Sequence, residues 1–131
     1  SLAMTKKKPI IKIYGNNYKT SDGTSIRDYI HVSDLADAHY KILEKISKIN
    51  KSMIINCGYS RGLSVNEVVN EFKNQSKKKI KILYQKRRVG DLSIVIANNK
   101  KLKNTINWKP KYFKLSTIVR SCIRWEKTIN R

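Results

Sequence analysis

The chain has 131 residues, about the size of one domain, and 40% of them are hydrophobic, which is enough for a modest core. With 29 Lys and Arg against 9 Asp and Glu, its formal net charge is +20. Five Gly and two Pro exclude collagen-like and linker-like chains, and two Cys are too few for a disulfide framework or a four-ligand zinc site. No apolar run approaches the roughly 20 residues that span a bilayer, so we expect a soluble, cytoplasmic protein.

The positive charge by itself favours nucleic acid or another acidic partner. Much of it comes from 22 Lys in a chain that also has 18 Ile and 12 Asn, residues whose codons are rich in A and T. The lysines are scattered along the chain, whereas a nucleic-acid-binding surface more often clusters arginines among aromatic residues. We therefore expect no nucleic-acid partner, and we keep a small basic nucleic-acid-binding module as an alternative.

The first third of the chain is predicted to form two strands and a helix. Ile10–Tyr14 has the composition of a short strand, and residues 15–25 are dense in turn formers and therefore form a loop. Arg27–Val32 alternates as a second strand. Ser33 can cap a helix whose apolar residues recur at helical spacing as far as about Ile49.

The middle of the chain continues the alternation of strands and helices. Met53–Cys57 is a continuous apolar run, which predicts a strand buried on both faces. Ser64 and Glu67 have the spacing of a capping box in front of an amphipathic helix. Ile80–Tyr84 and Leu92–Ala97 are predicted to be further strands.

Two helices are predicted near the end. Asn98 or Asn99 caps a short Lys-rich helix, and an apolar pattern that begins at Leu115 indicates a last amphipathic helix. Trp108 and Trp125 are predicted to anchor that last helix in the core.

The order of these elements predicts an α/β fold with α+β character. The predicted strands are few and short, and a strand buried on both faces needs a neighbour on each side. We therefore expect residues 1–131 to form one part of a larger domain.

No complete catalytic set can be recognised in the sequence. It contains no G-x-G-x-x-G dinucleotide motif, no G-x-x-x-x-G-K-[ST] loop, no Tyr-x-x-x-Lys pair and no Ser/His/acid set. His31 and His39 have no convergent ligands, so each is expected to pack or cap rather than bind a metal. Asp28 is expected to pair or cap locally rather than to act as a base.

The groups best suited to a ligand are arginines. Arg27 follows a glycine-containing loop, and Arg87 and Arg88 come just before Asp91. Because a guanidinium fork matches phosphate oxygens, two arginines from separate segments can hold a diphosphate, and Asp91 can accept a hydrogen bond from a ribose hydroxyl. The alternative for each arginine is an ordinary surface or ion-paired side chain.

Tyrosines lie near these arginines in the sequence. Tyr14, Tyr18 and Tyr29 can stack on a base or cover a sugar. The alternative is ordinary packing of aromatic residues on strands. Composition alone does not decide between the two.

The order of short motifs is more informative than any single residue. These motifs are YGNNY at 14–18, DGT at 22–24, RDYIHV at 27–32, DLADAH at 34–39, INCG at 55–58, GLSV at 62–65, RRVGD at 87–91 and WKP at 108–110. Over nearly the whole chain, this series resembles the C-terminal half of UDP-glucose 4-epimerases, members of the extended short-chain dehydrogenase/reductase superfamily. Related sugar-nucleotide dehydratases share the RD-x-x-x-V segment, but the long loop in front of it is typical of epimerases.

The resemblance implies that this chain binds a UDP-sugar. Arg27 and Arg88 resemble the two diphosphate-binding arginines of the family, and Asp91 resembles its acceptor for the uridine ribose. Tyr14, with the backbone of Lys12 and Ile13, resembles the wall of the family's uracil pocket. Tyr29 stands where the family lines the nucleotide site.

The resemblance also implies chemistry for which this chain lacks the residues. In the family, the NAD-binding loop and the catalytic Tyr and Lys lie in the N-terminal half, which is absent here. We therefore expect the substrate-binding part of an isomerase, inactive alone, with NAD as the cofactor of the full-length enzyme only. Four residues after Asp91 stands Val95, where some relatives have a bulky Tyr, so we expect a parent enzyme to admit 2-acetamido sugars as well as UDP-glucose.

Other interpretations stay open. The chain can be part of another nucleotide-sugar epimerase or dehydratase, a basic nucleic-acid-binding module, or a non-catalytic remnant domain. In the resembling family, Met53–Cys57 and the helix predicted from Ser33 pack on the N-terminal half. We therefore expect their apolar surface to be exposed or covered by self-association, which predicts a homo-oligomer and weak affinity for UDP-sugars.

Overall fold

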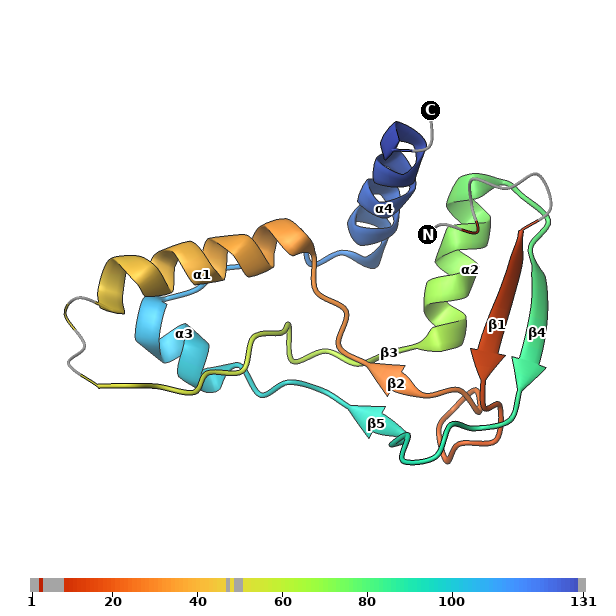
Figure 1. Ribbon diagram of the computed structural model, residues 1–131, viewed down its shortest axis with the longest axis horizontal. Coiled ribbons are helices and arrows are strands. Elements are labelled where there is room, and N and C mark those ends of the chain that lie inside the picture. The colour runs from red at the N-terminus through yellow and green to blue at the C-terminus, as the bar shows by residue number, and fades with distance from the viewer. Residues whose placement is uncertain (1–2, 4–8, 47, 49–50, 130–131) are drawn as a thin grey trace.

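The computed structural model describes residues 3, 9–46, 48 and 51–129, and these form an elongated α/β molecule (Figure 1). At one end lie the helices α1 (Val32–Ile46) and α3 (Lys100–Ile106), which pack on each other. At the other end α2 (Val65–Ser76) packs against α4 (Leu115–Ile129). No helix in the described part of the chain is both long enough and apolar enough to cross a membrane.

Two small sheets organise the strands. One sheet pairs two strands in parallel, β1 (Ile10–Tyr14) and β4 (Lys81–Gln85). The other has β2 in the middle, antiparallel to β3 and parallel to β5, and its strands are β2 (Ile26–Arg27), β3 (Leu63–Ser64) and β5 (Ile94–Val95). In this second sheet Arg27 lies opposite Leu63 on one side and opposite Val95 on the other.

Several local predictions are confirmed. The strand Ile10–Tyr14 has the predicted bounds, with Ile13 buried between exposed neighbours. The capping box is formed, because the Ser64 hydroxyl accepts from the Glu67 amide at 3.0 Å and the Glu67 carboxylate accepts from the Ser64 amide at 2.6 Å. The loop before β2 is fastened to this cap, since the Ser64 hydroxyl donates to Asp22 at 2.5 Å.

The strand predicted at Arg27–Val32 is wrong beyond Arg27, and α1 begins one residue before Ser33. His31 caps the helix instead, because its Nδ1 accepts from the Ser33 amide at 3.1 Å and its carbonyl accepts from the Asp34 amide at 3.0 Å. The alternating apolar and polar residues after Arg27 therefore belong to a turn that leads into α1, not to a strand. As described, α1 ends at Ile46, and the predicted end at Ile49 lies outside the described residues.

The strand predicted at Met53–Cys57 is also wrong. The segment runs beside α3, where the Lys101 ammonium donates to the Ile54 carbonyl at 2.7 Å, but it joins no ladder with any described residue. Ile54 is 88% exposed, so the segment is not buried on both faces. Of the strand predicted at Leu92–Ala97, only β5 forms, because β2 offers just two residues for it to pair with.

Trp108 lies in the core as predicted, but in a cluster with residues of α1 and α3 rather than of the last helix. Trp108 is buried with Ala38, Leu102 and Ile106. Trp125 is 63% exposed, and its predicted place in the core is wrong, because the face of α4 turned to the protein carries Ile118 and Val119 instead.

Candidate functional site

The carboxyl ends of β1 and β4 bring two loops together. Tyr14 lies opposite Gln85 at the end of this parallel pair, and the Gly15 amide donates to the Gln85 carbonyl at 2.9 Å. The loop after β4 carries Arg87 and Arg88, so both arginines meet the loop that follows β1. Ligands of open α/β sheets commonly bind at such carboxyl ends.

The two adjacent arginines have different surroundings. The Arg87 guanidinium lies over the Tyr18 ring at 3.9 Å and also donates to the Asn17 side chain and carbonyl, so it fastens the loop after β1. Arg88 lies over the Tyr14 ring at 4.0 Å. In the described part of the chain no hydrogen bond or ion pair occupies the Arg88 guanidinium, so its N–H donors are available to an anion.

Arg27 meets the same loop from β2. Its Nη2 lies 3.6 Å from Asp91 Oδ1, with both side chains about a third exposed, and its Nη1 donates to the Ile26 carbonyl at 2.8 Å. The Asp91 amide donates to the Arg88 carbonyl at 3.3 Å across a turn in which Gly90 has a φ of +82°, a conformation that favours glycine. Arg27 therefore lies against the loop that carries both Arg88 and Asp91.

Val95 lies next to Arg27, on β5. Opposite Arg27 in the β2–β5 register, it lines a hollow of about 560 Å³ together with Arg27, Asp28 and Asn56. Arg88 does not line this hollow. The predicted residues thus fall into two groups: Arg88 with Tyr14 at the end of β1, and Arg27 with Asp91 and the hollow next to Val95.

The three remaining predicted site residues differ in exposure. Lys12 is exposed on β1, and Ile13 is 3% exposed, so the Ile13 side chain belongs to the core and only its backbone faces the neighbouring strand. Tyr29 is half-buried after β2. Burial raises the pKa of the Tyr29 hydroxyl, and the nearby Arg27 charge only partly opposes that rise, so the hydroxyl stays protonated at neutral pH.

Asp28 has a larger role than the sequence indicated. Rather than pairing locally, its carboxylate accepts from the Tyr59 amide at 3.0 Å, the Ser60 amide at 2.9 Å and the Ala97 amide at 3.3 Å. These donors are 31, 32 and 69 residues away in sequence, so no local pattern reveals them.

Asp34 is a second carboxylate of this kind, in the first turn of α1. It accepts from the Tyr59 hydroxyl at 2.6 Å and from the Lys111 and Tyr112 amides at 2.9 and 2.8 Å. Burial alone raises the pKa of Asp34, but these three donors outweigh burial and lower it below 3.8. Burial and the hydrogen bond to Asp34 together raise the pKa of the Tyr59 hydroxyl far above its ordinary value.

The described residues form no metal site. No group of three or more His, Cys, Asp or Glu side chains in that part of the chain is arranged to hold a metal ion. Cys57 and Cys122 are both free thiols, and burial raises the pKa of Cys57.

Known proteins resemble this chain in sequence and in fold. The sequence model of the GDP-mannose 4,6 dehydratase family matches residues 2–122. A UDP-glucose 4-epimerase of Azospirillum brasilense is 40% identical over 98% of this chain, which spans 37% of that enzyme. Among solved structures, a UDP-glucose 4-epimerase of Stenotrophomonas maltophila with bound NAD and formylated UDP-arabinopyranose aligns with a TM-score of 0.90 and 29% identity, over 98% of this chain and 38% of that chain. The UDP-Glc/GlcNAc 4-epimerase of Campylobacter jejuni aligns with a TM-score of 0.84 and 40% identity, over 97% of this chain and 39% of that chain.

Proposed function

Because the chain belongs to the GDP-mannose 4,6 dehydratase family and has the fold of the C-terminal part of extended short-chain dehydrogenase/reductase epimerases, we propose that it binds the UDP-sugar substrate of a UDP-glucose 4-epimerase. In the intact enzyme this activity interconverts UDP-glucose and UDP-galactose. The chain spans 37% of the Azospirillum relative, so the remaining parts of the reaction are assigned to polypeptide outside this sequence.

One observation carries the proposal: the Arg27 guanidinium from β2 pairs with Asp91, which stands on the same loop as Arg88. Arg27 and Arg88 supply the forks for the two phosphates, and in the absence of ligand Asp91 pairs with Arg27 at 3.6 Å. Asp91 keeps a second oxygen for a ribose hydroxyl. Because a phosphate oxygen is a stronger partner for Arg27 than an exposed carboxylate is, ligand binding shifts Arg27 from Asp91 to the diphosphate.

Neighbouring residues complete the proposed subsites. The Tyr14 ring, which already supports Arg88 at 4.0 Å, borders the uracil, and the backbone of Lys12 and Ile13 meets the polar edge of the base. Tyr29 lines the nucleotide side of β2. The hollow next to Val95 receives the hexose, and the small Val95 side chain leaves room for a 2-acetamido group.

The nicotinamide cofactor does not fit the described residues. NAD is bound in the Stenotrophomonas epimerase structure. This sequence has no glycine-rich dinucleotide motif, and in the described part of the chain no glycine-rich turn leads from a strand into a helix. We therefore assign no step of hydride transfer to the residues of this chain.

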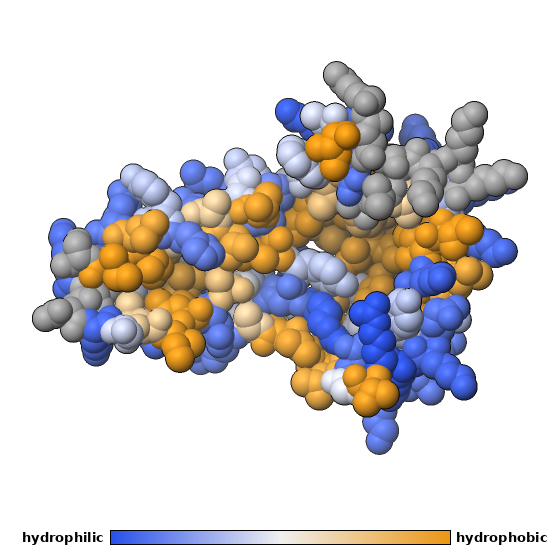
Figure 2. All heavy atoms as spheres, in the orientation of Figure 1, coloured by the Kyte–Doolittle hydropathy of each residue, from blue (hydrophilic) through white to orange (hydrophobic). Residues whose placement is uncertain are grey.

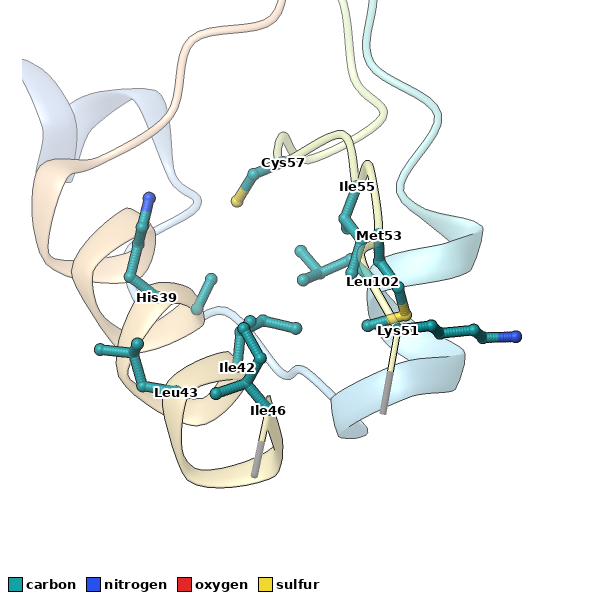
Figure 3. A pocket seen from close by; sticks show the side chains of 10 residues that line it. His39, Ile42, Leu43, Ile46, Lys51, Met53, Ile55, Cys57 and Leu102 are labelled. Carbon is teal, nitrogen blue, oxygen red and sulfur yellow. The ribbon is translucent and has the colours of Figure 1, made fainter. Parts of the chain in front are cut away.

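An apolar surface at the α1–α3 end is the proposed contact with a further polypeptide. Figure 2 shows hydrophobic residues over the end that contains α1 and α3. There α1 and residues 51–57 face each other across a hollow of about 280 Å³, with Ile42 and Ile46 on one side and Met53 and Ile55 on the other (Figure 3). Leu43 on α1 is 65% exposed.

The segment beside that hollow is open to a further strand. Apart from the bond from Lys101 to Ile54, no described residue hydrogen-bonds to the backbone of residues 53–57. We assign this surface to the nucleotide-binding part of the enzyme. In isolation a second copy of the chain covers it, which gives a homo-oligomer.

Titration calorimetry of the full chain with UDP and UDP-glucose tests the proposed function. We expect weak but saturable binding, and replacing Arg27 or Arg88 with Ala is expected to lower the affinity about tenfold, because each change removes charge-assisted hydrogen bonds. Arg120, exposed on α4, is the matched control, and R120A is expected to bind as the wild type does. Absence of UDP binding, or an equal loss for R120A and R27A, would contradict the proposal.

A further inference from the structure

The ladder that holds Arg27 is very short. β2 pairs with β5 only at Ile26 with Ile94 and at Arg27 with Val95, and the same two residues of β2 pair with Ser64 and Leu63 of β3. Ladders of two residues on each side give little rigidity beyond Arg27, where both of them end. The position of Arg27 therefore depends on what fixes the chain directly after it.

Directly after Arg27, where the strand pairing ends, hydrogen bonds to the Asp28 carboxylate hold the chain instead. Its Oδ2 accepts from the Ala97 amide at 3.3 Å, two residues past Val95, and from the Ser60 amide at 2.9 Å. Its Oδ1 accepts from the Tyr59 amide at 3.0 Å. One side chain thereby joins three segments that are far apart in sequence.

The backbone around Asp28 is shaped to that carboxylate. A Cβ on Gly58 would lie 2.6 Å from Asp28 Oδ2 and 2.6 Å from the Ala97 Cβ, so a larger residue at position 58 would displace one of them. The Ser60 hydroxyl donates to the Ala97 carbonyl at 2.8 Å, and the Asn99 side chain donates to the Gly58 carbonyl at 2.7 Å. The donors of Asp28 are therefore tied to one another as well.

Asp28 does not act by pairing with its neighbour. The Arg27 guanidinium is directed to Asp91 at 3.6 Å, whereas the only donors to Asp28 among the described residues are backbone amides. Asp28 also lines the hollow that Arg27 and Val95 share. Its effect on a ligand therefore passes through the placement of these two residues.

We propose that Asp28 is a positioning residue for substrate binding, whose carboxylate joins β2 to residues 59–60 and to residue 97 and so fixes Arg27 against the diphosphate of the nucleotide sugar. This inference rests on the proposed function. It adds a residue whose importance comes from its three amide donors rather than from contact with the ligand.

Asp34 offers a matched control. It too accepts three hydrogen bonds, and one of its donors is the hydroxyl of Tyr59, whose amide binds Asp28. The other donors of Asp34 are the Lys111 and Tyr112 amides, away from β2. D28N and D34N therefore make the same chemical change in two comparable clusters, of which only one adjoins Arg27.

The first test compares ligands with and without phosphates by NMR titration of the full chain. D28N is expected to weaken UDP binding about fivefold while uridine binding stays unchanged, because only the diphosphate needs Arg27. D34N is expected to leave the ratio of UDP to uridine affinity at the wild-type value. The double variant R27A/D28N is expected to bind UDP as R27A does, since Asp28 acts through Arg27. A D28N protein that loses UDP and uridine binding equally, or binds UDP normally, overturns the proposal.

A second readout needs no ligand. In D28N we expect faster hydrogen exchange at the Tyr59, Ser60 and Ala97 amides, and a shifted or broadened Arg27 side-chain Nε–H resonance. In D34N the faster amides are those of Lys111 and Tyr112, and the Arg27 resonance is unchanged. If the wild type does not bind UDP, the proposed function fails, and the Arg27 resonance still decides the positioning: an unchanged Arg27 signal in D28N overturns it.

Discussion

Replacing Asp34 with Asn is expected to destabilise the chain strongly. The Asp34 carboxylate is 2% exposed and accepts from the Tyr59 hydroxyl and from two backbone amides. An Asn of the same size has one acceptor oxygen and presents an N–H₂ group to the remaining donors. The substitution therefore turns charge-assisted bonds into neutral ones and leaves at least one buried donor unpaired.

The cost of D34N follows from these changes. Hydrogen bonds to a charged group contribute about 1 kcal/mol more than neutral ones, and a buried unpaired donor costs about 1–3 kcal/mol, so we expect a loss of about 3 kcal/mol at neutral pH. Domains of ordinary stability have about 5–15 kcal/mol in total, so this loss is large.

Urea unfolding followed by tryptophan fluorescence measures the loss, because the buried Trp108 ring stacks on Tyr59. The effect also depends on pH. Since the folded pKa of Asp34 lies below 3.8, its contribution is complete above that value and disappears as the pH falls through the folded pKa. The difference in stability between wild type and D34N is therefore expected to narrow as the pH falls below 3.8. A cost below about 1 kcal/mol at neutral pH, or a gap that does not narrow in acid, would refute this reasoning.

Three further predictions follow from other parts of the molecule. S64A removes both the cap of α2 and a hydrogen bond to Asp22, so urea unfolding is expected to show a loss of about 1–2 kcal/mol, and an unchanged midpoint would contradict the capping role. Light scattering is expected to show that the wild type is an oligomer. L43K, which places a charge at the 65% exposed Leu43 on α1, is expected to convert it to a monomer, whereas the control K103A on α3 is not. A monomeric wild type would count against the apolar interface. A gel-shift assay at two salt concentrations is expected to show no tight, strongly salt-dependent binding of DNA or RNA, and such binding would favour the basic-module alternative.

Sequence predicted the local features of this fold better than its long-range ones. The strand Ile10–Tyr14 and the capping box at Ser64 depend on neighbouring residues, and both are confirmed. The strand predicted at Met53–Cys57 needed a ladder partner that the described residues do not provide. Trp125 was assigned to the core as the last member of the apolar pattern that begins at Leu115, but in the structure it is 63% exposed.

The same division applies to the candidate site. Arg27, Arg88 and Asp91 stand out in the sequence because their chemistry suits a diphosphate and a ribose, and in the structure Arg27 pairs with Asp91 on the loop that carries Arg88. Their roles in binding stay predictions. Asp28 could not be singled out from the sequence, because it is defined by amide donors up to 69 residues away.

A residue-resolved map of UDP binding tests the central claim most directly. In an NMR titration of the full isotope-labelled chain, we expect the largest shift changes at Tyr14, Arg27, Arg88 and Asp91, all saturating with one dissociation constant. Changes confined to α4 or spread over the scattered lysines, or no saturable change at all, would contradict the claim that these residues grip a nucleotide diphosphate.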